Sequence, residues 1–194
     1  MLKLIAAPFL CLFMLSACVQ TPPTPTYPDI TFNHLNEIPL DIAAITSTLS
    51  HADRFDGGHI EALTPISLGA MAANWANQRV EAAGESGIFT FDVRRASIIQ
   101  TDLETQKGVV GFFTVEQGTH YQADLEIIME AIDENSGRKA VANSTITQSL
   151  TVAENLSLTE RNKEIYSLIE ATLTAMDQQL SNDIGLYFQR FNPQ

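Results

Sequence analysis

The chain has 194 residues, of which 45% are hydrophobic and 18% charged, which is typical of a globular protein with one substantial core. Its formal net charge is −12 at pH 7, which disfavours binding to nucleic acid and docking of a basic face on anionic lipid. Both cysteines, Cys11 and Cys18, lie close to the N-terminus. The remainder therefore has no disulfide, no cysteine-ligated metal and no thiol nucleophile.

The first residues have the features of a bacterial signal peptide. Lys3 supplies a positive charge, and the apolar run Leu4–Leu15 is shorter than the roughly 20 residues that a spanning helix needs. The run ends in Leu15-Ser16-Ala17-Cys18, which resembles the bacterial lipobox. The resemblance implies that residues 1–17 are removed and that Cys18 receives lipid. An ordinary secretory signal that ends near a cysteine is the alternative.

Residues 18–37 are predicted to be the lipidated cysteine and a tether. Two or three acyl chains on Cys18, which the lipobox resemblance implies, would hold the protein firmly on a membrane. Val19 stands where well-studied lipoproteins kept on the inner membrane have Asp, which favours the outer membrane. The proline-rich stretch Thr21–Pro28 should extend as polyproline II over roughly 25 Å. A proline-rich peptide ligand is the alternative for this stretch.

Residues 38–194 are expected to form a single periplasmic domain that begins with a strand and a helix. The β-branched segment 40–49 predicts the strand, and the polar segment 50–61 a loop. Thr64-Pro65 predicts a helix start and Gly84 its stop. One helix face is apolar: Leu68, Ala72, Trp75 or Ala76, Val80 and Ala83. Trp75 is either a core residue on that face or a ligand-stacking ring.

Three strands are predicted next. The first, over 88–103, should contain a register break near two adjacent arginines. The second, over 121–131, alternates apolar with polar residues, so one face should be buried and the other wet. A turn at 134–137 should join it to the third, over 139–152, in a hairpin.

A long helix should end the domain. Ser157 and Glu160 fit a capping box, and an apolar stripe runs on to Tyr187. Because about 30 residues reach roughly 45 Å, more than a small sheet is wide, the helix end near Gly185 should project. The predicted fold is α+β, with a mainly antiparallel four-stranded sheet and both helices packed on one face, in the order β-α-β-β-β-α.

The element order over 38–188 resembles several envelope lipoproteins, among them the lipoprotein partner of the lipopolysaccharide-assembly barrel and the auxiliary lipoproteins of ABC-type lipid transporters. In local amino-acid sequence the chain resembles a group of uncharacterised proteobacterial lipoproteins. Three sequence segments carry that resemblance: Leu40-Asp41-Ile42-Ala43, Asn74-Trp75-Ala76-Asn77-Gln78-Arg79-Val80-Glu81-Ala82-Ala83-Gly84, and Leu150-Thr151-Val152-Ala153-Glu154. The group implies a fold and brings no activity with it.

The densest cluster of reactive side chains lies in the predicted loop and could suit zinc or iron: His51, Asp53, Asp56, His59 and Glu61. Its spacing matches no ligand motif, and it lacks the alternating ligands of a calcium loop. Polar loops also gather Asp and His without binding metal. We therefore expect no metal and no cofactor, and His51, Asp53, Asp56 and His59 remain the residues to inspect.

Arg94 and Arg95 are the only adjacent arginines in this acidic chain. An anionic headgroup or a partner's carboxylate could dock on them, and an internal ion pair is the alternative. The sequence contains no Gly-x-Ser-x-Gly elbow for a serine nucleophile. The segment 108–111 lacks the lysine and the strand-to-helix context of a phosphate-binding loop.

These observations favour a non-catalytic, lipid-anchored domain that acts by binding, as an accessory to envelope assembly or transport. Its expected partners are membrane lipid, through Cys18, and an envelope protein that contacts the sheet face or the groove between the helices. One alternative is an apolar-ligand carrier whose cavity is lined by Trp75, Phe89, Phe91 and Met129. The other is a metal-dependent enzyme that uses the loop 51–61.

Overall fold

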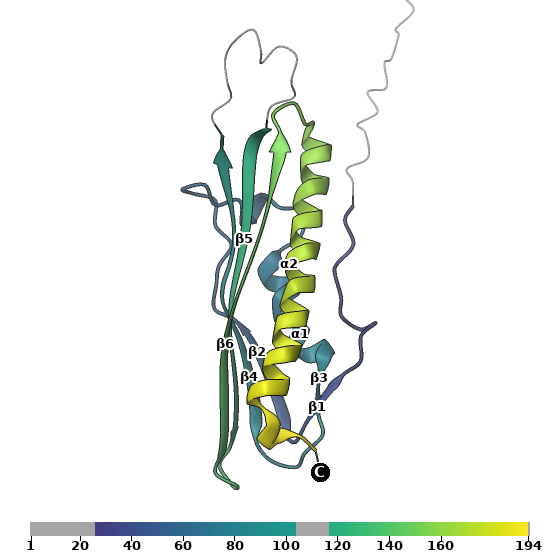
Figure 1. Ribbon diagram of the computed structural model, residues 1–194, viewed down its shortest axis with the longest axis vertical. Helices are drawn as coiled ribbons and strands as arrows, with labels where there is room; N and C mark the ends of the chain where they lie inside the picture. The colour runs from purple at the N-terminus through teal and green to yellow at the C-terminus, as the bar shows by residue number, and fades with distance from the viewer. Residues whose placement is uncertain (1–25, 104–116, 194) are drawn as a thin grey trace, which may run out of the picture.

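The structure, a computed structural model, describes residues 26–103 and 117–193, and it confirms the predicted α+β fold (Figure 1). The main sheet has the order β2 (Ala44–Leu49), β4 (Ile88–Asp102), β5 (Gln117–Asp133) and β6 (Arg138–Ala153). Strands β4, β5 and β6 are antiparallel neighbours, as predicted, whereas β2 runs parallel to β4.

Both helices cover one face of this sheet (Figure 1). Helix α1 (Leu68–Arg79) packs on β2 and β4, and helix α2 (Leu158–Tyr187) packs on β6 and β5. The predicted alternation along β5 is confirmed, because the side chains that face the helices are fully buried: Tyr121, Ala123, Leu125, Ile127, Met129 and Ala131. The capping box at Ser157 and Glu160 is also present.

Strand β4 contains the predicted register break, which lies between Val93 and Arg95 in its pairing with β5. Before the break Phe89, Phe91 and Val93 face the helices, and after it Ala96 and Ile98 do. The break is a β-bulge, which places one extra residue in β4. This extra residue keeps the apolar side chains of the 15-residue strand on the buried face.

The predicted first strand, 40–49, is divided in two. β1 (Ile38–Leu40) pairs in parallel with β3 (Val80–Ala82) in a separate two-stranded sheet, and only β2 enters the main sheet. Between them the Ile42 amide donates to the carbonyl of Leu40 at 2.8 Å, which turns the chain. β-branched composition indicated extended backbone and carried no signal for this turn.

The predicted bounds of the first helix, 64–84, were wrong. Ser67 is the N-cap, and its hydroxyl accepts from the Ala70 amide at 3.2 Å. Thr64 instead donates its hydroxyl to two loop carbonyls. Val80 leaves the helix with extended backbone angles and pairs with Ile38. Gly84 lies beyond β3, where a Cβ atom would come within 2.6 Å of the Ile42 amide nitrogen.

The expectation that the end of α2 projects was also wrong. The helix runs along the strands and not across them (Figure 1), and a strand of 17 residues such as β5 spans about 55 Å. Phe188 and Phe191, just beyond the helix, are fully buried. The ring of Phe188 packs edge-on against Phe89, with 5.7 Å between the centroids.

Replacement of Phe188 by alanine should lower the free energy of unfolding by about 3–5 kcal/mol, because it removes a fully buried ring and leaves a cavity. The neighbouring Tyr187→Ala variant is the matched control, since Tyr187 is 58% exposed and should change stability by about 0.5 kcal/mol or less. Urea unfolding measures both values. Equal effects of the two substitutions would contradict the packing of the chain end described above.

Candidate functional site

The N-terminal end of the described chain is bound to the helices. The ring of Tyr27 lies 5.1 Å from that of Tyr166 on α2, whose hydroxyl donates to the carbonyl of Pro28 at 3.2 Å. Phe32 is buried, and its amide donates to the side chain of Gln78 on α1 at 2.7 Å. Cys18 lies outside the described residues, and the lipid anchor and the domain limits stay predictions.

Contacts of the chain itself occupy much of the groove between the helices, one of the two surfaces expected to bind a partner. Asp177 on α2 accepts from the indole of Trp75 at 2.8 Å and from the guanidinium of Arg79 at 2.7 Å. Arg79 also donates to the Ser181 hydroxyl at 3.2 Å. A hollow of about 420 Å³ remains between the N-terminal segment and α2.

The side chains expected to line an apolar-ligand cavity belong to the core. Trp75, Phe89, Phe91 and Met129 are all fully buried. Trp75 stacks on Phe91 with 5.5 Å between the ring centroids. Their surfaces are thus used in packing α1 and the chain end onto the sheet.

In the loop 51–61 the polar side chains hold the loop against β4. Glu61 is buried and accepts from the Ile98 amide at 2.7 Å and from the Arg54 amide at 3.2 Å. The Nδ1 atom of His59 lies 2.8 Å from the same carboxylate, and Asp56 forms an exposed ion pair with Arg54. Across residues 26–103 and 117–193, no three His, Cys, Asp or Glu side chains gather into a metal-binding group, and His51 and Asp53 join none.

The two adjacent arginines lie on the outer face of the sheet, away from the helices. Arg94 pairs with Asp92 at 2.7 Å, and Arg95 with Glu126 at 3.6 Å, and about half of each arginine side chain is exposed. Both therefore have carboxylate partners within the chain. Docking of an anion on this pair stays a prediction.

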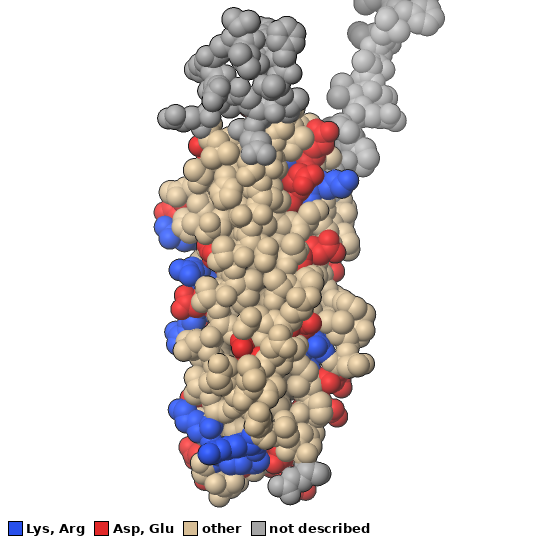
Figure 2. Space-filling view, viewed as in Figure 1, with Lys and Arg blue, Asp and Glu red and all other residues tan. Residues whose placement is uncertain are grey.

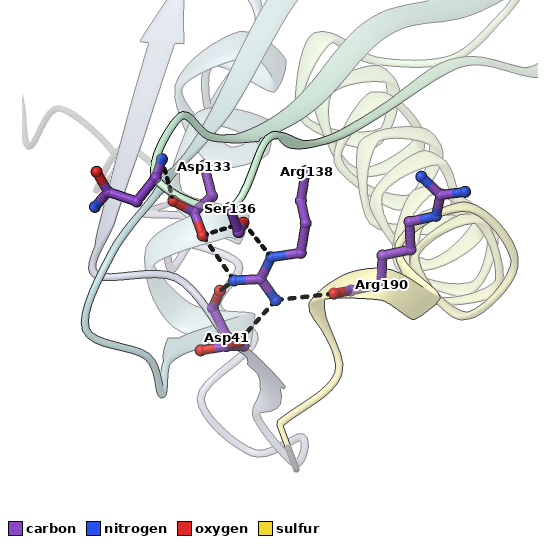
Figure 3. A network of polar contacts seen from close by, with 6 residues as sticks. Asp41, Asp133, Ser136, Arg138 and Arg190 are labelled. Atoms are coloured by element: carbon purple, nitrogen blue, oxygen red, sulfur yellow. Dashed lines mark hydrogen bonds and ion pairs between the residues drawn. The ribbon is translucent and has the colours of Figure 1, made fainter.

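A polar network centred on Arg138, which we call the Arg138 junction, joins three distant parts of the chain (Figure 3). Its guanidinium donates to the carboxylates of Asp41 and Asp133, at 2.7 and 2.9 Å, and to the Ser136 hydroxyl at 2.8 Å. It also donates to the carbonyl of Arg190 at 3.0 Å. The sequence placed Arg138 next to a turn, but its contacts with residues about 50 and 100 positions away carry no local signal.

The turn between β5 and β6, which carries Asp133 and Ser136, is held in place by charge and hydrogen bonds. The hydroxyl of Ser136 and the guanidinium of Arg138 hold the pKa of Asp133 far below its usual range, although burial acts in the opposite direction. The two carboxylates in turn raise the pKa of Arg138. Phe191 completes the junction, because its ring centroid lies 4.9 Å from the guanidinium carbon.

Beside the junction, on the outer face of the sheet, lies a hollow of about 370 Å³ that we call the turn hollow. It is lined by Gly87, Ile88, Thr90, Ile132, Asp133, Glu134 and Asn135. Ile88 is 51% exposed and lies opposite Ile132 across the β4–β5 pair, and Val141 on β6 is exposed diagonally to Ile132. The arrangement offers an apolar floor and a rim of hydrogen-bonding groups.

No protein-family model and no curated protein sequence matches the chain. Among solved structures it is similar to a minor lipoprotein from Acinetobacter baumannii, at 13% identity and a TM-score of 0.39, over 79% of this chain and 97% of that one. A Xanthomonas campestris protein of the DUF330 family is similar at 15% identity and a TM-score of 0.36, over 82% and 86%. PelC from Paraburkholderia phytofirmans is similar at 17% identity and a TM-score of 0.23, over 72% of this chain and 90% of that one.

These neighbours include a lipoprotein and a DUF330 protein. With TM-scores below 0.5 they carry no argument about function. Within the described residues, no helix combines the length and apolar character needed to cross a bilayer.

The Asp133 carboxylate should make the free energy of unfolding depend on pH in the acidic range. Because its pKa is lowered in the folded protein, its contribution is present at neutral pH and is lost as the pH falls below about 4, where the unfolded carboxyl takes up a proton. Urea midpoints measured between pH 6 and pH 3 should therefore fall less steeply for Asp133→Asn than for the unmodified protein. Glu134→Gln, on the same turn, should follow the unmodified protein, and parallel curves for all three would contradict the account.

Proposed function

We propose that the protein is a lipoprotein anchored through Cys18 to the outer membrane, and that its periplasmic domain binds an envelope protein as a non-catalytic accessory of assembly or transport. The turn hollow is the proposed contact surface. The observation that carries the proposal is an apolar floor, made by the exposed Ile88 and the half-buried Ile132, beside a turn that the Arg138 junction holds in place.

The composition of the turn hollow suits a protein partner. Exposed apolar side chains that gather beside a hollow are typical of interaction sites, whereas single ones are ordinary. Thr90, Glu134 and Asn135 on the rim can hydrogen-bond a partner's backbone. A hollow of this size accepts one or two apolar side chains, which favours a loop or an extended segment as the bound element.

The Arg138 junction supports the proposal through its effect on the rim. A turn tied to Asp41 and to the chain end through one guanidinium loses little conformational freedom when a partner binds. Preorganisation of this kind strengthens binding because less entropy is lost. The rim is therefore suited to recognition of one geometry.

The place of the tether supports the proposal as well. Tyr27 contacts Tyr166 in the first turns of α2, whereas the β5–β6 turn lies at the opposite end of the domain (Figure 1). Residues 26–37 therefore leave the turn hollow uncovered. An anchored domain can then bind a partner while its lipid stays in the membrane.

Ile88→Asp tests the contact surface. Co-purification of the full-length lipoprotein from membranes in mild detergent should return a stoichiometric envelope protein, and Ile88→Asp should reduce its recovery at least about tenfold, because a carboxylate then replaces the apolar floor. Leu158→Asp is the matched control, since Leu158 is also an exposed apolar residue and lies at the other end of the domain. Equal recovery with both variants would contradict the assignment of the site.

Cys18→Ala tests the anchor. Without the sulfur that receives lipid, the protein should move from the membrane fraction to the soluble envelope fraction. Immunoblotting of the two fractions measures the distribution. A Cys18→Ala protein that stays in the membrane fraction would contradict attachment through this cysteine, and Cys11→Ala is the matched control.

A further inference from the structure

Strand β6 is the edge strand of the main sheet, and its free edge is unusually unprotected. It has 16 residues, and among the described residues only β5 pairs with it, on one side. From Ala140 to Ala153 it contains no charged residue and no proline, and its pairing with β5 is regular from Ala140 to Val152. Natural proteins usually block such an edge with charges, proline or bulges, because an open edge can pair with another strand.

The uncharged surface extends from β6 onto the neighbouring helix. Asp177 faces α1 on one flank of α2, and the opposite flank, which borders β6, has exposed or half-exposed uncharged residues: Ala171, Ala175, Gln179, Asn182 and Leu186. Figure 2, drawn in the view of Figure 1, shows charged side chains gathered along the two sides of the molecule. The strip between them, over α2 and β6, has few.

We propose that this edge pairs with β6 of a second copy of the chain, in antiparallel orientation, so that two four-stranded sheets become one of eight strands. The charges at the ends of β6 favour a second copy as the occupant. The strand starts with Arg138-Lys139, and Glu154 follows its last residue. Antiparallel pairing centred on Ile146 places Arg138 of each copy opposite Glu154 of the other, with Lys139 next to that pair.

The same arrangement suits the helices. A twofold axis normal to the sheet keeps both α2 helices on one face and makes them antiparallel neighbours. The small side chain of Ala171 on one copy then meets the large side chain of Leu186 on the other, which is 64% exposed. Small residues opposite a large one allow two helices to approach closely.

The pairing also has a consequence for the anchor. The two copies point in opposite directions along β6, so their tethers leave from opposite ends of the pair. Both lipids reach one membrane if β6 lies along its surface and if each proline-rich stretch spans the roughly 25 Å expected from its sequence. This inference is independent of the proposed function, because Ile88 takes no part in the pairing.

Disulfide formation tests the register. In the proposed pair Asn143 of one copy lies opposite Ser149 of the other on the outer face, so the Asn143→Cys, Ser149→Cys double variant should form a covalent dimer when membranes are oxidised. Ala44→Cys with Thr46→Cys, on the opposite edge strand β2, is the matched control and should stay monomeric. Equal yields from both variants, or a band whose mass matches a different protein, would overturn the proposal.

Charges placed on the edge test the association itself. Thr145→Lys with Ser149→Lys puts four like charges near the twofold axis and should weaken the dimer at least about tenfold. Ala44→Lys with Thr46→Lys on β2 should leave it unchanged. Sedimentation of the full chain carrying Cys18→Ala measures the association, and circular dichroism verifies that each variant is folded. A monomeric unmodified chain, or a dimer indifferent to the β6 charges, would overturn the proposal.

Discussion

The Arg138 junction is the contact on which the far end of the domain depends. One guanidinium binds Asp41 before β2, Asp133 and Ser136 at the β5–β6 turn, and the carbonyl of Arg190 after α2. A buried carboxylate such as Asp133 is tolerated only because it is paired and hydrogen-bonded. The segment before β2, the β5–β6 hairpin and the segment after α2 are therefore held together at one point, and the rim of the turn hollow is fixed with them.

The distribution of side chains over the sheet explains which surfaces are left for binding. The face toward the helices is apolar and closed, with Trp75, Tyr121 and Phe89 fully buried. The outer face carries paired charges, such as Lys139 with Glu130 at 2.7 Å, and exposed apolar side chains near the β5–β6 turn. The binding roles proposed for this protein therefore belong to the outer face and the free edge of β6, which the helices do not cover.

Periodicity in the sequence predicted the elements whose environment is uniform along their length, and failed where a local contact changes the backbone. The alternation in β5, the hairpin, the break near Arg95 and the capping box at Ser157 are confirmed. Thr64-Pro65 looked like a helix start, but the hydroxyl of Thr64 binds loop carbonyls and Ser67 takes the cap. The turn hollow was missed because Ile88 and Ile132 lie 44 residues apart and meet only through the pairing of β4 with β5.

We propose that this domain acts by binding a protein at the turn hollow. Cross-linking in living cells tests it most directly, with an amino acid activated by ultraviolet light in place of Ile88 in the full-length lipoprotein and, as a reference, in place of Leu158. The account predicts one discrete adduct with an envelope protein from position 88 and none from position 158. No adduct from position 88, or the same adducts from both positions, would contradict it.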